Sequence, residues 1–70
     1  MTPAQFRDTL KALGWTTGGL ARLLGCSGDR VRNWIRSDAR HRVPADVAAW
    51  LERRLEAHER WMRDDPPPSP

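Results

Sequence analysis

Apolar side chains recur at steps of three and four residues along most of the chain, which is the period of one face of an α-helix. Phe6, Leu10 and Leu13 follow this spacing in the first segment, and Val31, Trp34 and Ile35 repeat it later. Sustained alternation of apolar and polar residues, the pattern of a half-buried strand, does not occur in the sequence. The pattern therefore predicts an all-α, four-helix domain.

Capping residues mark the ends of the first two predicted helices. Residues 2–5 (Thr-Pro-Ala-Gln) are typical of a capping box with proline at the first helical position. Gly14 is placed to end this helix in the left-handed conformation, with Trp15 folding back against it. Thr16 is expected to cap a second helix that stops at Gly25. Three leucines are predicted to form the inward face of that helix: Leu20, Leu23 and Leu24.

The third and fourth helices are separated by a basic loop. Ser27 is expected to cap a helix over about 28–36, and Pro44 to open a long one over about 44–63. Residues 64–70 are rich in proline and are predicted to form a disordered tail after a domain spanning 1–63. The apolar and aromatic stripe of the last helix is Val47, Trp50, Leu51, Leu55, His58, Trp61 and Met62.

Positive charge is concentrated in the first part of the chain. The net charge is +3, and of the 12 Lys and Arg side chains Lys11 is the only lysine. Eight basic and three acidic side chains give residues 1–42 a charge of +5, whereas four basic and six acidic ones give residues 43–70 a charge of −2. Arginine recognises phosphates and bases through a forked pair of donors, so this asymmetry favours a polyanionic partner.

The segment 17–36 has the spacing that two helices need when they cross steeply over a short turn. A small Ala21 lies where the helices touch, Gly25 lies where the backbone turns, and apolar residues seal the wedge: Leu20, Leu24, Cys26, Val31 and Trp34. Together with Pro44 opening the next helix, these residues resemble the helix-turn-helix of the Cro and phage-repressor (XRE-type) family. The chain is also similar to small anti-CRISPR-associated regulators of this kind.

This resemblance implies that residues 28–36 form a recognition helix in the major groove of DNA. Gly28 and Asp29 occupy the family's usual reading positions; glycine reads nothing, and an aspartate can only accept a hydrogen bond, for example from a cytosine amine. Base contacts are therefore expected from Arg32, Asn33, Asp29 and Arg36. Phosphate contacts are expected from Thr17, Arg22, Ser27, Arg30, Arg40, His41 and Arg42.

Part of the last helix extends beyond the predicted motif. Its stripe predicts a homodimer interface, because exposed tryptophan and methionine side chains form a patch that a partner covers. The expected interface residues are Leu55, His58, Trp61 and Met62. Cys26 is expected in the core, as are Trp15, Trp34 and Trp50.

The sequence thus predicts a homodimeric repressor or autoregulator that binds an inverted repeat of double-stranded DNA in a bacterial, phage or mobile-element operon. The alternative is an antitoxin or another module that binds a partner protein. Neither histidine has acidic or thiol partners at ligand spacing, so we expect no metal, no cofactor and no enzymatic activity. We also expect no small-molecule effector, no membrane segment and a cytoplasmic location.

Overall fold

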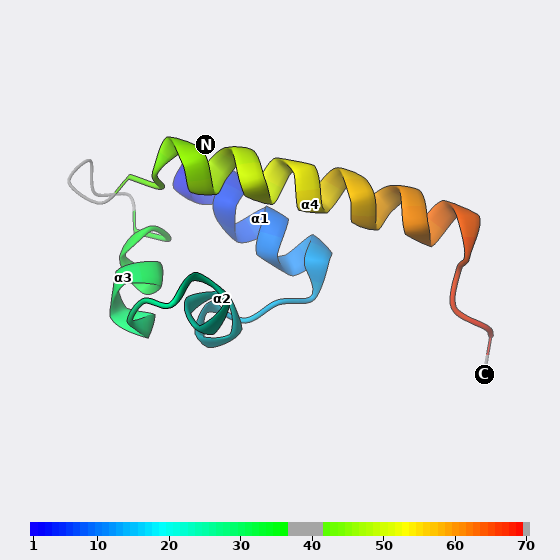
Figure 1. The fold of residues 1–70 in the computed structure, drawn as a ribbon, viewed down its shortest axis with the longest axis horizontal. Coiled ribbons are helices and arrows are strands. Elements are labelled where there is room, and N and C mark those ends of the chain that lie inside the picture. The colour runs from blue at the N-terminus through cyan, green and yellow to red at the C-terminus, as the bar shows by residue number, and fades with distance from the viewer. Residues whose placement is uncertain (37–41, 70) are drawn as a thin grey trace.

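Four α-helices make up the regular structure of the chain. The computed structural model describes residues 1–36 and 42–69, and within them it contains α1 (Pro3–Leu13), α2 (Thr17–Leu24), α3 (Gly28–Asn33) and α4 (Ala45–Asp64), with no strand. The molecule measures 42 × 19 × 19 Å, and α4 runs along its upper side in Figure 1. The prediction of an all-α fold is confirmed.

The first two helices begin and end at the predicted residues. At the start of α1 the Thr2 N–H donates to Gln5 Oε1 at 2.8 Å and the Gln5 N–H donates to Thr2 Oγ1 at 3.1 Å, which is the expected capping box. At the start of α2 the Gly19 N–H donates to Thr16 Oγ1 at 2.9 Å. Gly14 and Gly25 end these helices at φ of 74° and 70°, a conformation that costs a glycine little.

Each of these glycine ends is closed by a second backbone hydrogen bond. The Trp15 N–H donates to the Leu10 carbonyl at 2.9 Å, and the Cys26 N–H donates to the Ala21 carbonyl at 3.0 Å. This is the Schellman pattern, which uses carbonyls that a helix end leaves without partners. Only residues 25–27 separate the end of α2 from the start of α3.

The third helix is shorter than predicted. Ser27 caps it as expected, with Oγ accepting from the Arg30 N–H at 3.2 Å, but α3 ends at Asn33 and not at Arg36. The N–H groups of residues 34, 35 and 36 instead donate to carbonyls three residues back, at 3.1, 3.1 and 3.2 Å. Such bonds wind the chain more tightly than an α-helix, as is common in a last turn. A tryptophan followed by a β-branched isoleucine at this point gives little intrinsic support for continuing the α-helix.

The last helix agrees with its predicted range to within one residue at each end. Pro44 stands at the N-cap without a side-chain hydrogen bond, and α4 runs for 20 residues. The described residues after it, 65–69, have no regular secondary structure. None of the helices in the described ranges is both long and apolar enough to cross a membrane.

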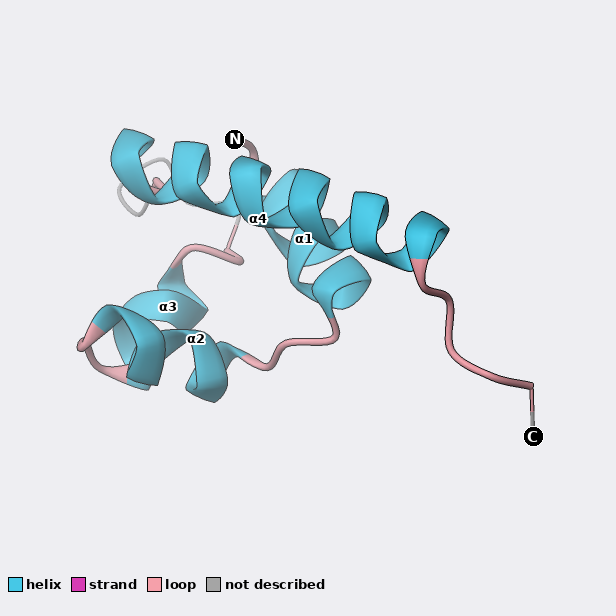
Figure 2. Cartoon of the chain, turned by 45° about the vertical axis from the view of Figure 1, so that its right-hand side comes forward, coloured by secondary structure: helices cyan, strands magenta, loops and turns pink. Residues whose placement is uncertain are grey.

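The core contains one fully buried side chain from every helix. Phe6, Leu20, Val31 and Leu51 are each 0% exposed. The helices pack in two pairs, α1 against α4 and α2 against α3, as Figure 2 shows. The four buried side chains belong to one cluster, which joins the two pairs into a single unit.

Several expectations about the core need correction. Leu23 is 63% exposed, so α2 does not bury all three predicted leucines; Leu20 is buried and Leu24 is half-buried. Trp34 is buried, whereas Cys26 is half-buried and packs against the edge of the core.

Two more tryptophans lie at the edge of the core, although we expected them inside it. Trp15 and Trp50 are half-buried and face each other with ring centroids 5.8 Å apart. The Arg54 guanidinium lies 5.5 Å from the centre of the Trp50 ring, so this pair is covered partly by a cation. Thr9, which the apolar pattern did not single out, is buried and donates its hydroxyl to the Gln5 carbonyl at 2.7 Å.

Candidate nucleic-acid interface

The outward side of α3 and of the turn after it gathers the residues expected to contact bases. Asp29, Arg32, Asn33 and Arg36 line one open hollow of about 410 Å³, together with Ile35. They meet there because their spacing of three and four residues keeps them on one side of a helix, opposite the buried Val31. We call these five residues the α3 hollow. The structure thus brings the predicted base-contacting side chains together.

Within the α3 hollow, Arg32 and Asp29 form an ion pair. The guanidinium Nη2 of Arg32 donates to Asp29 Oδ1 across three residues of the helix. Both side chains remain open to solvent, at 60% and 84% exposure. The guanidinium also lies over Gly28, where an added Cβ would meet Arg32 Nη1 at 3.4 Å. The sequence predicts no contribution from Gly28, whereas in the structure the Arg32 guanidinium lies beside this glycine, at a distance where a methyl group would still make ordinary contact.

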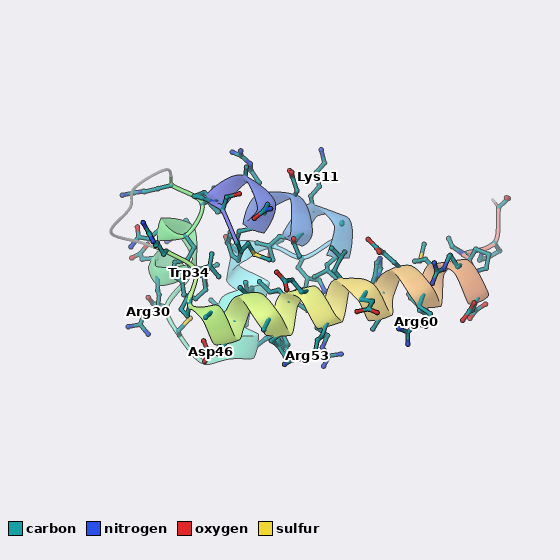
Figure 3. The ribbon with its side chains drawn as sticks, turned by 90° about the horizontal axis from the view of Figure 1, so that it is seen from above. Lys11, Arg30, Trp34, Asp46, Arg53 and Arg60 are labelled. Atoms are coloured by element: carbon teal, nitrogen blue, oxygen red, sulfur yellow. The ribbon has the colours of Figure 1, made fainter. Side chains whose placement is uncertain are left out.

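Arg30 lies apart from this group, on the flank of α3 that faces the start of α4. It lines a second hollow, of about 580 Å³, with Trp34, Asp46 and apolar residues of the α2–α3 turn and of the α4 N-terminus. In Figure 3 the Arg30 side chain projects outward, whereas Trp34 belongs to the buried cluster.

The remaining residues expected at phosphates occupy separate places. Thr17 is the first residue of α2 and is half-buried, Arg22 is exposed on the same helix, and Arg42 is exposed ahead of α4. The Ser27 hydroxyl oxygen accepts the capping hydrogen bond, which leaves its own proton for donation. Arg40 and His41 lie outside the described residues.

The second half of α4 extends past the other helices, as Figure 1 shows. We call residues 55–64 the α4 overhang. Leu55 still packs against the core, but Trp61 is 57% exposed, and His58 and Met62 are half-buried. The rings of His58 and Trp61 lie 6.0 Å apart. On a neighbouring part of the helix Arg60 Nη2 and Glu56 Oε1 form an exposed ion pair at 3.2 Å.

Within residues 1–36 and 42–69, no three His, Cys, Asp or Glu side chains gather where they could hold a metal ion. Comparisons with protein families, with curated proteins and with solved structures find no match to this chain.

Proposed function

We propose that this protein is a sequence-specific repressor or autoregulator that binds double-stranded DNA as a homodimer. The observation that carries the proposal is the α3 hollow. It presents two guanidinium groups and one carboxamide beside each other on α3 and the turn that follows it. Arginine and asparagine are the side chains that pair with guanine and adenine edges through two hydrogen bonds each.

The connection between α2 and α3 supports this proposal. A helix that enters the major groove must stand clear of the rest of the protein, and a second helix must hold it rigidly from behind. Here α2 packs on α3 across a three-residue turn, and Val31 seals the contact with 0% exposure. The side of α3 that carries the α3 hollow faces away from this contact.

Charge supports the same conclusion. Arg22, Arg30 and Arg42 are exposed on α2, on α3 and just ahead of α4. Phosphate contacts supply most of the sequence-independent affinity for DNA and fix the orientation of the protein on it. The α4 overhang gives the proposed dimer its interface, and two copies of α3 then reach successive major grooves of an inverted repeat, about 34 Å apart. Occupancy of a promoter would exclude polymerase, in the cytoplasm of a bacterial cell.

The first experiment is the selection of duplexes from a random pool, followed by fluorescence-anisotropy titration at several salt concentrations. If each protomer neutralises three or four phosphates, the logarithm of the binding constant falls with the logarithm of salt at a slope of about −6. Removing two cations per protomer with Arg30→Ala and Arg42→Ala should bring the slope to about −2 or −3 without changing the preferred sequence.

Arg53→Ala is the matched control, since Arg53 projects from α4 on the side that Figure 3 shows and belongs to no part of the interface. It removes one cation per protomer, half the charge that the double variant removes, and should leave the slope unchanged. A slope near zero, or failure to select any duplex, would overturn the DNA-binding proposal and favour a protein partner.

A further inference from the structure

Gly28, Asp29 and Arg32 lie next to one another at the start of α3, and their arrangement goes beyond what the proposed function requires. Asp29 holds the guanidinium of Arg32, and that guanidinium extends over Gly28. Nη1, Cζ and Nη2 of Arg32 would lie 3.4, 3.8 and 3.9 Å from a Cβ at position 28. The Arg32 guanidinium therefore lies over the first turn of the helix, where a methyl group at position 28 would make ordinary contact with it and a longer side chain would compete for its place.

A guanidinium held in this way keeps donors available. Arginine has five N–H donors arranged as a planar fork, and the contact with Asp29 Oδ1 uses Nη2. The donors left over suffice for a pair of parallel hydrogen bonds to one flat acceptor edge. In the major groove, guanine presents two acceptors side by side, O6 and N7, and is the base that arginine reads most often.

We propose that Asp29 and Gly28 position Arg32 to read one guanine in each half-site of the operator. This inference rests on the proposed function and names the base that its reading face selects. Asp29 is then a positioning residue that acts through Arg32, in place of the direct contact with a cytosine amine expected from the sequence. Gly28 contributes because a side chain longer than that of alanine at this position would occupy the space of the guanidinium.

The charges of the groove favour this arrangement. An isolated carboxylate near DNA phosphates is repelled, whereas a carboxylate paired with Arg32 carries little net charge into the groove. In the free protein an exposed ion pair of this kind contributes little to stability. Its effect is to hold a flexible side chain near one orientation, so that less conformational freedom is lost when the base is bound.

The test uses the full chain and the duplex obtained by selection. Each guanine is replaced in turn by 7-deazaguanine, which lacks the N7 acceptor, and by inosine, which keeps both O6 and N7. For the unaltered protein, one 7-deazaguanine position per half-site should weaken binding roughly 10-fold, and inosine there should not. Arg32→Ala should bind the normal duplex and the 7-deazaguanine duplex equally, because the reading group is gone.

Variants of Asp29 and Gly28 distinguish a loss of Arg32 positioning from a loss of folding. Asp29→Ala should lose roughly 5- to 10-fold of the preference for that guanine and bind random duplex as well or better, since a negative charge is removed. A variant that merely unfolds would lose both the guanine preference and the binding to random duplex. Gly28→Leu should lose the same preference because its side chain fills the space of the guanidinium, whereas Gly28→Ala, whose Cβ makes ordinary contact, should keep most of it.

Each contrary result would overturn one part of the proposal. Insensitivity to 7-deazaguanine at every position, or equal sensitivity in Arg32→Ala, would show that Arg32 reads no guanine. An unchanged guanine preference in Asp29→Ala would remove Asp29 from the positioning. Failure to select any duplex would overturn the proposed function and this inference together, whereas a selected duplex without these dependences would overturn the inference alone.

Discussion

The ring of Phe6 on α1 meets the indole of Trp34, just after α3, edge to face, with centroids 5.8 Å apart and planes at 83°. Both side chains are buried, at 0% and 6% exposure. This geometry places the positive edge of one ring against the negative face of the other. It also joins the α1–α4 pair to the α2–α3 pair, so the contact holds α3 in place relative to the rest of the protein.

We predict a measurable coupling between these two rings. Phe6→Leu and Trp34→Leu should each destabilise the domain, and the double variant should lose less than the sum by about 0.5–1.5 kcal/mol. The measurement is urea unfolding followed by circular dichroism, with trimethylamine N-oxide present so that every variant stays folded. Strict additivity would show that the rings contribute only through the area they bury.

Two leucines of α2 should differ sharply in their contribution to stability. Leu20→Ala removes a side chain of 0% exposure and should lower the free energy of unfolding by about 2–5 kcal/mol. Leu23→Ala makes the same chemical change at a side chain that is 63% exposed, and should stay within about 0.5 kcal/mol of the parent. Thermal unfolding of the two variants side by side tests the corrected face of α2, and equal losses would contradict it.

Replacing Gly25 or Gly18 by alanine should change the free energy of unfolding in opposite directions. Gly25 has a φ of 70°, so Gly25→Ala should destabilise by about 1–2 kcal/mol. Gly18 lies inside α2 with nothing within 4 Å of an added Cβ. Gly18→Ala should therefore stabilise by about 0.5–1 kcal/mol, since alanine favours the helix more than glycine does. A loss of stability in both variants would mean that Gly18 is needed for a close approach.

The α4 overhang should determine the oligomeric state. Trp61→Glu places a charge in the exposed patch, and sedimentation should then find a monomer that binds the operator far more weakly. Arg63→Gln changes the net charge by the same amount, about 200° around the helix from Trp61, and should remain a dimer. An unchanged dimer in Trp61→Glu would place the interface elsewhere on the molecule.

Asn33 should contribute to sequence preference and not to general affinity. Asn33→Ala should weaken operator binding by about 1–3 kcal/mol because a carboxamide can pair with an adenine edge through two hydrogen bonds. Binding to random duplex should hardly change, since Asn33 carries no charge. Equal losses on both kinds of DNA, in parallel anisotropy titrations, would show that Asn33 reads no base.

Much of the fold was predictable because its signals are local. The Thr2–Gln5 capping box, the glycines at 14 and 25 and the Thr16 and Ser27 caps each depend on a few neighbouring residues, and each was found where the sequence predicts it. The face shared by Asp29, Arg32, Asn33 and Arg36 follows in the same way from the helical period.

What the sequence did not predict depends on contacts between distant residues. Leu23 obeys helical spacing relative to Leu20, but α2 buries the side that carries Ala21, which lies on the other side of Leu20 around the helix. The tighter turn over residues 34–36 and the pairing of Asp29 with Arg32 were not foreseen. Spacing permits an ion pair at three residues' separation, but it cannot decide between that pair and a contact with another molecule.

One continuous helix, α4, contains two levels of local stability. Its first half is anchored by Leu51 at 0% exposure, so we expect the amide hydrogens beyond its first turn to exchange with solvent mainly when the core opens. The α4 overhang is ten residues long, and a helical segment of that length is marginal in water without packing. Its amides can exchange by fraying from the C-terminal end. If a second copy covers Trp61, amide exchange in the α4 overhang will slow as protein concentration rises. The exchange rates of this segment will then measure dimer formation.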